Sequence, residues 1–416
     1  MKESQASDKR KEFMVNLRKE QIDNLIGARR RRVLMNISSQ GGKKIDELPE
    51  SETVLAWFLE CKQELQKSSS DHHLAALSRV REILGMSESR PPVSEFLEAG
   101  LFPIILDAIG PSAKFRNNEF LHQASWTVAN MCMASEEQLT NMINRSLLFS
   151  IDLSLRDENM DQKIIDNFVW ALCNMTGQYK SIMFKVLDHP IIQTVYTYFM
   201  KPHLTKEVMT RLAWLCSNIL RAKDLEMKIT DKFAGFACRA FLEINYSECD
   251  EESLSAISMY LDPTLDKDTR IKNIMDSGVF KKIKLLLLET VDKPSMIRSA
   301  IRAYGNCFSG QEWVTDALLD SDVVRAIVRH SQRKELLIQR DGLWCLANVA
   351  AGSQRQVYIV ATPETFRVVL MLISQGYSPV IKEALAFMNN YLLNASSSHI
   401  ENTLRSLQND VSIRSL

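Results

Sequence analysis

Short apolar runs alternate with polar stretches along most of the chain. Two examples are Phe102–Ile109 and Val279–Leu288, in which apolar residues dominate a run with the length of a short helix. Each run of this kind predicts a buried helix that closes one repeating segment. The same pattern places segment boundaries near residues 72, 112, 157, 203, 248, 290, 332 and 376. We therefore predict a chain that is built from repeated helical units.

A second pattern pairs an aromatic residue with an asparagine four positions later. The pairs are Trp126/Asn130, Trp170/Asn174, Trp214/Asn218 and Trp344/Asn348, with the variants Arg302/Asn306 and Ala386/Asn390. Trp126, Trp170 and Trp214 follow one another at 44 residues, and Trp344 follows Arg302 at 42. Residues four apart share one helix face, so each pair places a ring beside a carboxamide. The repetition is typical of a row of binding elements and not of a catalytic site.

The length of the repeat indicates the architecture. A period of roughly 40 to 47 residues is that of a HEAT or armadillo unit, which buries its apolar face only against its neighbours. Of the 416 residues 45% are hydrophobic, whereas the 14 glycines and 11 prolines are few for a sheet-rich protein. An all-α solenoid is predicted. The repeats override the two or three globular domains that length alone suggests.

Cysteine usage and the length of the apolar runs indicate the compartment. The eight cysteines are single, with no Cys-x-x-Cys motif, and five of them lie within five residues of a Trp/Asn position. We interpret them as small buried hydrophobic residues in a reducing compartment. No apolar run approaches the roughly 20 residues of a membrane span, and the charged amino terminus has no signal-peptide core. A protein of the cytoplasm, the nucleus or both is expected.

The formal net charge of zero hides an uneven distribution. Residues 1–36 contain ten Lys/Arg and five Asp/Glu, which gives a net charge of +5. The remaining residues contain 41 Lys/Arg and 46 Asp/Glu, which gives a net charge of −5. Attraction between this tail and the body is expected. The densest basic cluster is Arg29, Arg30, Arg31 and Arg32, inside a possible basic helix at residues 9–35. On charge alone, a nonspecific nucleic-acid-binding tail is an open alternative.

Several stretches resemble one protein family. They are the segment Pro91–Pro103, the helical stretches ASWTVANM, FVWALCNMTG, LAWLCSNIL, IRAYGN and LWCLANVAAGS, and the amino-terminal VNLRKEQIDNLIGARRRR. Together they resemble importin-α (karyopherin-α) over nearly the whole chain. The resemblance implies an all-α, armadillo-repeat right-handed superhelical solenoid with a basic N-terminal helical tail. We divide the chain accordingly into an importin-β-binding-like basic segment at 1–36, a linker at 37–56 and about eight armadillo repeats at 57–416.

The function that the resemblance implies is that of a nuclear import adaptor without enzymatic activity or cofactor. Its third helices line a concave groove, in which a basic nuclear localisation signal lies extended. The residue types agree independently, because asparagine amides both donate to and accept from a peptide backbone. Parallel tryptophan rings hold the stems of lysine or arginine through cation–π contacts of roughly 0.5–2 kcal/mol. The alternative is that these tryptophans are simply core residues.

The family's major peptide site, formed by repeats two to four, is altered. The residues that match it are Trp126, Asn130, Trp170, Asn174, Trp214 and Asn218. The aspartate that anchors the key lysine corresponds to Gln178, and a neutral amide cannot replace a carboxylate as an ion partner. The glycine and threonine of the same pocket correspond to Ala134 and Leu139.

The minor site, formed by repeats six to eight, is better kept. Its matching residues are Arg302, Asn306, Gly310, Thr315, Asp341, Trp344, Asn348, Glu383 and Asn390, although Ala386 replaces the last aromatic residue. Cargo binding biased toward the minor site is therefore predicted. Ser255 and Met259 replace the aromatic pair of the fifth repeat, which predicts a break in the groove. The acidic run Glu248–Glu252 is predicted to be a solvated loop between repeats.

The two ends of the chain also differ from the family pattern. The residues that match the importin-β-binding helix are Leu17, Arg18, Lys19, Asp23, Arg29, Arg30, Arg31 and Arg32. The same residues are candidates for an autoinhibitory contact with the groove. The chain has room for eight repeats where the family has ten, so the surface that binds the export receptor is expected to be missing.

Two functional classes are left open by the sequence. The first is an adaptor that shuttles between cytoplasm and nucleus, carrying cargo with basic signals together with importin-β. The second is an importin-α-derived armadillo scaffold that holds a fixed partner in a structural or regulatory assembly. Nucleic-acid binding through the arginine cluster is a third, weaker option, and no specific nucleic acid and no membrane are expected as partners. The common nucleotide-binding, hydrolase and metalloprotease motifs are absent from the sequence. No metal site is predicted.

Overall fold

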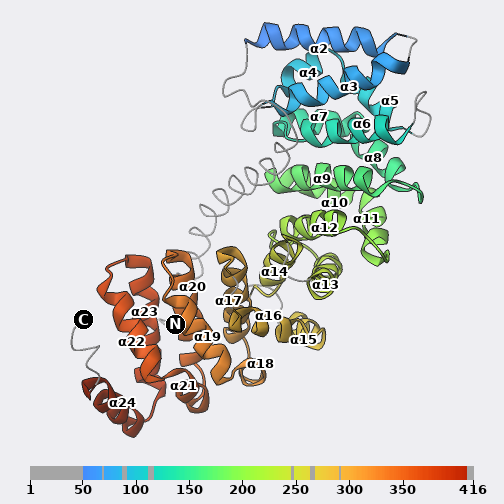
Figure 1. Cartoon of the computed structure of the whole chain (residues 1–416). Helices are drawn as coiled ribbons and strands as arrows, with labels where there is room; N and C mark the ends of the chain where they lie inside the picture. Colours follow the sequence, from blue (N-terminus) through green and yellow to red (C-terminus); the bar gives the residue numbers. More distant parts are fainter. Residues whose placement is uncertain are drawn as a thin grey trace. The chain divides into compact units, whose positions relative to one another are not determined.

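The fold was obtained as a computed structural model that describes residues 50–67, 70–86, 91–110, 117–244, 248–262, 268–289 and 292–409. Every regular element within these ranges is a helix, which confirms the predicted all-α class. The basic segment at 1–36 lies outside the described residues. Two compact units, residues 1–208 and 209–416, divide the chain within helix α12, and in each unit the helices stack in sequence order (Figure 1).

The amino-terminal unit contains repeats one to four. Repeat one has two described helices and repeats two and three have three each, followed by the helices of repeat four. Their bounds are α2 Ser51–Leu65, α3 Ser70–Gly85; α4 Val93–Glu98, α5 Phe102–Ile109, α6 Asn118–Met131; α7 Glu136–Asn144, α8 Leu147–Leu155, α9 Gln162–Gln178; α10 Lys180–Asp188, α11 Ile191–Met200 and α12 Lys206–Ile219. Helix α2 begins inside the range 37–56 that was predicted to be a linker.

The carboxyl-terminal unit contains repeats five to eight. The helices after α12 are α13 Met227–Glu243, α14 Glu248–Tyr260; α15 Asp268–Asp276, α16 Val279–Leu288, α17 Pro294–Phe308; α18 Glu312–Leu318, α19 Ser321–Ser331, α20 Leu336–Ala350; α21 Gln354–Val360, α22 Pro363–Ser374, α23 Ser378–Asn394; and α24 Ser397–Asn409. A short first helix precedes two longer ones in repeats six to eight. Three helices per repeat distinguish armadillo units from two-helix HEAT units.

Tight turns join the first and second helices of a repeat. Gly100 before α5 and Gly278 before α16 have φ of 70° and 80°, in the left-handed region that glycine adopts without strain. Ser146 before α8 occupies the same region, with φ of 75°. Side-chain caps start several helices, as in the box formed by Ser135 and Gln138 at α7. These local signals fix where each helix begins.

The second helices of successive repeats are joined by hydrogen bonds. A side chain of one second helix donates to a carbonyl at the end of the second helix in the preceding repeat. Ser154 donates to the Ile109 carbonyl over 2.7 Å, and Tyr198 donates to the Leu155 carbonyl over 2.8 Å. In the carboxyl-terminal unit, Arg329 and His330 of α19 contact the Leu287 carbonyl of α16 over 2.6 and 2.9 Å. The last carbonyls of a helix lack partners within it. Each repeat therefore completes the helix end of its predecessor.

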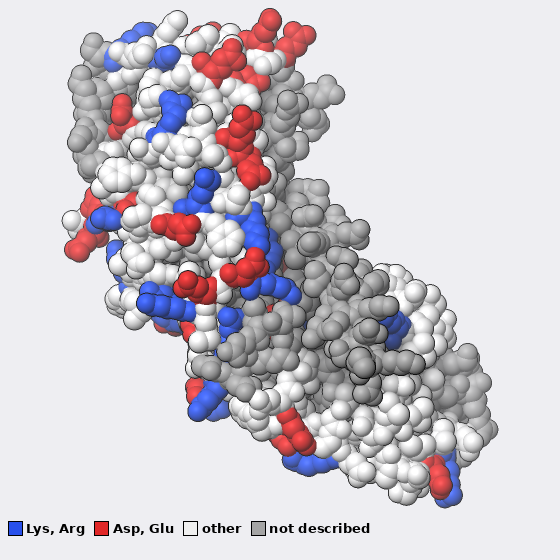
Figure 2. Space-filling model, turned by 180° about the vertical axis from the view of Figure 1, so that it is seen from behind, with Lys and Arg blue, Asp and Glu red and all other residues white. Residues whose placement is uncertain are grey.

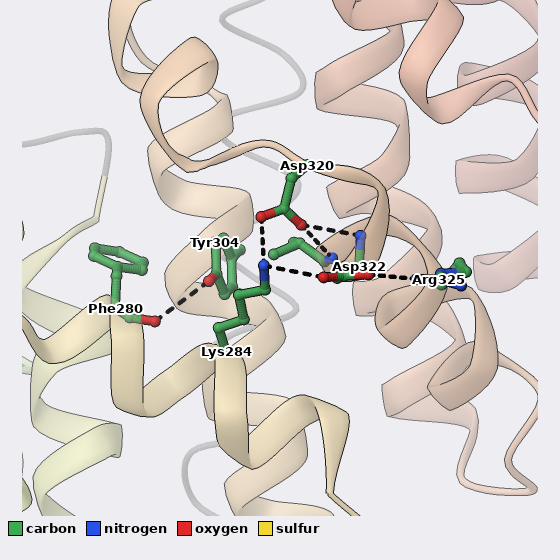
Figure 3. A network of polar contacts seen from close by, with 7 residues as sticks. Phe280, Lys284, Tyr304, Asp320, Asp322 and Arg325 are labelled. Atoms are coloured by element: carbon green, nitrogen blue, oxygen red, sulfur yellow. Dashed lines mark hydrogen bonds and ion pairs between the residues drawn. The ribbon is translucent and has the colours of Figure 1, made fainter.

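An ion network supports the same row of helices. Lys284 of α16 reaches Asp320 and Asp322 at the start of α19, over 2.5 and 3.4 Å, and Arg325 pairs with Asp322 from the other side (Figure 3). The Asp320 carboxylate also accepts from the backbone N–H groups of residues 322 and 323, so it caps α19. These groups are largely exposed, so solvent screens the pairs and they contribute little to stability.

The acidic run Glu248–Glu252 is not the solvated loop that was predicted. It forms the first turn of α14, and the Asp250 side chain is fully buried. The Asp250 carboxylate is 3.1 Å from Lys282 of α16, which also donates to the Phe241 and Ile244 carbonyls at the end of α13. Acidic residues favour a helix amino terminus, and a buried carboxylate requires an ion partner. The partner is 32 residues away in sequence, so it was invisible to a local pattern.

All eight cysteines are buried and none of them forms a disulfide, as predicted for small hydrophobic residues. Burial raises the pKa of the Cys132 and Cys307 thiols far above the usual value, and that of Cys249 to about 11. Thiols with raised pKa values are inert, because the thiolate is the reactive form. These residues act as packing groups.

Candidate peptide-binding face

The Trp/Asn pairs lie on the last helix of each repeat. We call the surface that these helices form within each unit its third-helix face; the helices are α3, α6 and α9 in the amino-terminal unit and α14, α17, α20 and α23 in the carboxyl-terminal unit, and α12 crosses the boundary between the units. Within each unit, neighbouring third helices pack directly, as α3 does on α6 and α17 on α20. This packing aligns the pairs of successive repeats into columns.

The asparagine column forms a hydrogen-bonded ladder between repeats. The asparagine Nδ2 group donates to a carbonyl of the preceding third helix: Asn130 to Arg81 over 3.2 Å, Asn174 to Ala129 over 2.9 Å, Asn306 to Ser258 over 2.8 Å, Asn348 to Gly305 over 2.9 Å and Asn390 to Ala347 over 2.8 Å. One amide hydrogen is thus used to join repeats, a role that sequence reasoning missed. The amide oxygen and the second hydrogen are the groups with which a peptide backbone could bond.

Asn306 is an exception within the column. Its side chain is 1% exposed, and its Oδ1 atom is buried without a hydrogen-bond partner, which costs roughly 1–3 kcal/mol. Because the atom is buried, Asn306 joins two repeats but presents no group to a bound chain, unlike partly exposed Asn348 and Asn390.

The tryptophan column is partly exposed. Trp126, Trp214 and Trp344 keep part of their surface in solvent, whereas Trp170 is only 4% exposed. The Arg81 guanidinium lies 4.3 Å from the centre of the Trp126 ring, which is a cation–π contact made by the chain itself. Trp344 packs across Gly305: a Cβ atom built on that glycine would lie 2.3 Å from the ring. The glycine therefore permits the ring to approach the backbone of α17.

The pocket expected to hold the key lysine has a different chemistry. Gln178 donates through Nε2 to the Asn174 carbonyl over 2.8 Å and to the Cys132 carbonyl over 3.1 Å. It thereby joins the ends of α6 and α9. Ala134 and Leu139 are both buried, at 3% and 0% exposure. At these three positions the structure offers a helix-end contact and apolar packing, and no carboxylate.

The acid of the minor site is already paired with arginines. Asp341 is 3% exposed, and its carboxylate lies 2.7 Å from Arg298, 2.5 Å from Arg340 and 3.9 Å from Arg302. Burial by itself raises the pKa of Asp341, but the three guanidinium groups outweigh it and lower the pKa to about 2. The carboxylate that was expected to select a cation therefore serves internal arginines. Sequence reasoning missed Arg298 and Arg340, although their spacing of 42 residues was visible.

The other predicted positions of the minor site differ in exposure. Thr315 is buried, and Glu383 and Asn390 of α23 are partly exposed. In the fifth repeat Ser255 is buried and lies 3.3 Å from the Ser217 hydroxyl, where other repeats carry a ring. The predicted importin-β-binding residues, Leu17, Arg18, Lys19, Asp23 and Arg29–Arg32, lie outside the described residues.

On the face that Figure 2 draws, side chains of both charge signs lie interspersed among the described residues. Within the described ranges, no cluster of three or more His, Cys, Asp or Glu side chains has an arrangement suited to a metal ion. In the same ranges, no single helix passes a length and hydropathy test for a membrane span; α21 and α22 pass only as a pair, bent by 70°.

Comparisons with known proteins were made for sequence and for structure. No protein-family model matches the chain. Importin subunit alpha-1b of Oryza sativa subsp. japonica is 23% identical over 289 residues, covering 68% of this chain and 51% of the relative. Importin subunit alpha-9 of Arabidopsis thaliana is 20% identical over 399 residues, covering 89% of this chain and 72% of the relative. The chain is thus similar to importin-α subunits, and it spans about half the length of the first of these relatives.

The structure comparison supports the fold. The crystal structure of an engineered protein matches with a TM-score of 0.70 at 17% identity, over 86% of each chain. At this identity the likeness shows the fold alone.

Proposed function

We propose that this protein is an import adaptor of the importin-α type, which holds an extended peptide on its third-helix face. The observation that carries the proposal is the asparagine column, in which Asn348 and Asn390 each use one amide hydrogen to join repeats and keep part of the side chain exposed to a bound chain. The relatives named as importin subunits support it. The protein acts by binding and not by catalysis.

The proposed ligand is the basic nuclear localisation signal of a cargo protein. Partly exposed Trp344 offers its ring to lysine and arginine stems, which gain roughly 0.5–2 kcal/mol from such a contact, whereas Arg81 already covers one face of Trp126. Partly exposed Glu383 supplies negative charge beside Asn390. Residues 1–36 are proposed to bind importin-β or to occupy the face when importin-β is absent. Such a protein shuttles between cytoplasm and nucleus.

Fluorescence polarisation with a labelled basic signal peptide tests the proposal. The full chain is compared with Trp344→Ala/Asn348→Ala and with Trp170→Ala/Asn174→Ala, and thermal unfolding verifies that each variant is folded. A greater loss in the first variant supports binding biased toward the minor site. A greater loss in the second shows that Gln178 is tolerated in the major site. Absence of binding to the unaltered chain, also after Arg29–Arg32 are replaced by alanine, would overturn the adaptor proposal.

A second candidate function is an armadillo scaffold that holds a fixed partner. Two observations favour it: Gln178 replaces an anchoring acid and is used at helix ends, and Asp341 is paired with three arginines. The two functions differ in their dependence on the amino-terminal segment. Replacing Arg29–Arg32 by alanine should abolish nuclear accumulation of a reporter cargo for an adaptor, whereas a scaffold keeps its partner in a pull-down with the same variant.

A further inference from the structure

The asparagine ladder also fixes which residues of successive third helices are equivalent. Three ladder asparagines donate to the carbonyl of the residue directly before the asparagine of the preceding repeat, and these carbonyls belong to Ala129, Gly305 and Ala347. In the same way, the Asn130 side chain donates to the carbonyl of Arg81 in repeat one, over 3.2 Å. Arg81 therefore occupies the position at which repeats two, six and seven carry alanine or glycine.

The tryptophan of the following repeat packs on this position. Trp344 lies across Gly305, where a Cβ atom would be 2.3 Å from the ring. Trp126 is related to Arg81 in the same way, and the guanidinium of Arg81 lies 4.3 Å from the centre of the ring. Cation–π contacts extend to about 6 Å, so this contact is a close one. Repeat one thus places a cation of the chain itself on the ring, whereas repeat six places a glycine there.

Arg81 is held in this position with its charge intact. Its side chain is 19% exposed, and its Nε atom is buried with no hydrogen-bond partner among the described residues. Its Nη2 atom lies 2.9 Å from a Glu82 oxygen, but the Glu82 side chain is 61% exposed, so water screens the pair. The guanidinium stays protonated, because arginine does not lose its proton in proteins. A positive charge therefore remains on the Trp126 ring.

We propose that Arg81 is a specificity-determining residue, which occupies one face of the Trp126 ring and thereby excludes a lysine or arginine of the bound peptide from that face. One ring face accommodates one cation, and a second positive charge beside Arg81 would be repelled. The inference rests on the proposed binding of a basic peptide. It adds a boundary to that binding, because the basic residues of the ligand then bind beyond the contact between α3 and α6.

Fluorescence polarisation on the full chain tests the inference, with a labelled peptide of consecutive lysine and arginine residues that is long enough to extend past repeat two. Arg81→Ala keeps the hydrogen bond of Asn130, because that bond uses the backbone carbonyl of residue 81. The variant uncovers the Trp126 ring, so the affinity for the peptide should rise by about three- to tenfold. The measurement is repeated with Arg29–Arg32 replaced by alanine in every variant, so that the basic amino-terminal segment does not compete with the peptide.

Arg79→Ala is the matched control for the loss of one positive charge. Arg79 also lies on α3, but its side chain is 51% exposed and pairs with Glu60 of α2 over 3.2 Å. Its replacement should change the affinity for the peptide by less than about twofold. Arg81→Gln keeps most of the stem and loses the charge, so it should also raise the affinity and gives an independent reading if Arg81→Ala is unstable in a thermal melt.

A second background shows whether the gain in affinity depends on the ring. In a chain that also carries Trp126→Ala, no ring face is uncovered when Arg81 is replaced. Arg81→Ala should then raise the affinity by less than about twofold, because the two residues act as one contact.

The outcomes separate this inference from the proposed function. Binding of the basic peptide to the unaltered chain, with no gain in Arg81→Ala or Arg81→Gln, overturns the inference and leaves the adaptor in place. An equal gain in Arg79→Ala, or a gain that persists without Trp126, reduces the effect to general charge repulsion and also overturns the inference. A peptide that binds neither the unaltered chain nor Arg81→Ala overturns both.

Discussion

Replacing Gly305 by alanine tests how closely the third helices must approach. A Cβ atom on residue 305 would lie 2.3 Å from Cζ3, 2.8 Å from Cε3 and 2.9 Å from Cη2 of Trp344. Carbon atoms in favourable contact are about 3.5–4.0 Å apart, so the ring has to move by more than about 1 Å. Gly305 is buried on α17, whereas Trp344 is partly exposed, so the ring has to shift away from α17 toward solvent. Overpacking of this kind costs about 1–3 kcal/mol.

The chain offers a matched control in Gly235. This residue lies in the interior of α13, and a Cβ atom there would meet nothing within 4 Å. Alanine in a helix interior is about 1 kcal/mol more favourable than glycine, and both variants gain this amount. The difference between the two variants therefore isolates the cost of the contact with Trp344. We expect Gly235→Ala to be stabilised by up to about 1 kcal/mol and Gly305→Ala to be less stable than it by about 1–3 kcal/mol.

Urea unfolding followed by circular dichroism at 222 nm measures both effects. The midpoint for Gly305→Ala should fall below that for Gly235→Ala, and binding of a peptide to the third-helix face should weaken because Trp344 is displaced. Equal rises in stability for the two variants would refute the reasoning. That result would mean that the ring moves aside without cost and that its position over Gly305 is not required.

Four other predictions concern the ladder, the buried acid, the strained turn and the thiols. Asn174→Ala removes the 2.9 Å hydrogen bond to the Ala129 carbonyl and should lower the free energy of unfolding, measured by urea titration, by about 1–3 kcal/mol. Asn389 is exposed and serves as the control: a similar loss for Asn389→Ala would contradict a specific role of the Asn174 hydrogen bond. The pKa of Asp341 in the folded protein, about 2, is below the ordinary 3.8. Ionisation of Asp341 therefore adds roughly 2 kcal/mol to the free energy of unfolding above pH 4, and this contribution is lost as the pH falls to 2. If the free energy of unfolding depends on pH in the same way for the wild type and for Asp341→Asn, this reasoning is refuted. Ser146→Gly relieves a left-handed backbone at φ 75° and should raise stability by about 0.5–1 kcal/mol in thermal melts, while Ser150→Gly inside α8 should lower it. The eight buried thiols should not react with a colorimetric disulfide reagent until urea unfolds the protein, and rapid labelling of the native chain would contradict their inertness.

The helical repeat architecture could be predicted because its signal is periodic. Trp126, Trp170 and Trp214 recur at one spacing, and that spacing alone distinguishes a repeat array from globular domains. The first described helix, α2, begins at Ser51, before the expected residue 57, since a repeat period does not fix the residue at which a helix starts. The acidic run at 248–252 was predicted wrongly, because its ion partner Lys282 comes from a later helix.

The candidate site could be predicted in its positions but not in its pairings. The sequence places the asparagines at one position of the repeat, yet their hydrogen bonds to carbonyls 43 or more residues away depend on how third helices pack. Likewise, Asp341 was noted as an acid, while the number of arginines around it depends on the register between α17 and α20. A linear pattern gives the face on which a residue lies. It does not give the partner from the neighbouring helix.

The joining of repeats through helix ends has a consequence for how the chain is made. Tyr198 donates to the Leu155 carbonyl, and Asn174 donates to the Ala129 carbonyl. A repeat that has left the ribosome therefore lacks these hydrogen-bond partners until the next repeat has also been synthesised. Synthesis adds about 5–20 residues per second, so successive repeats of about 43 residues emerge a few seconds apart. Native structure should therefore form in steps behind the growing end, with the newest repeat always the least protected. Pulse-labelled hydrogen exchange on stalled nascent chains would show this as protection that lags one repeat behind emergence.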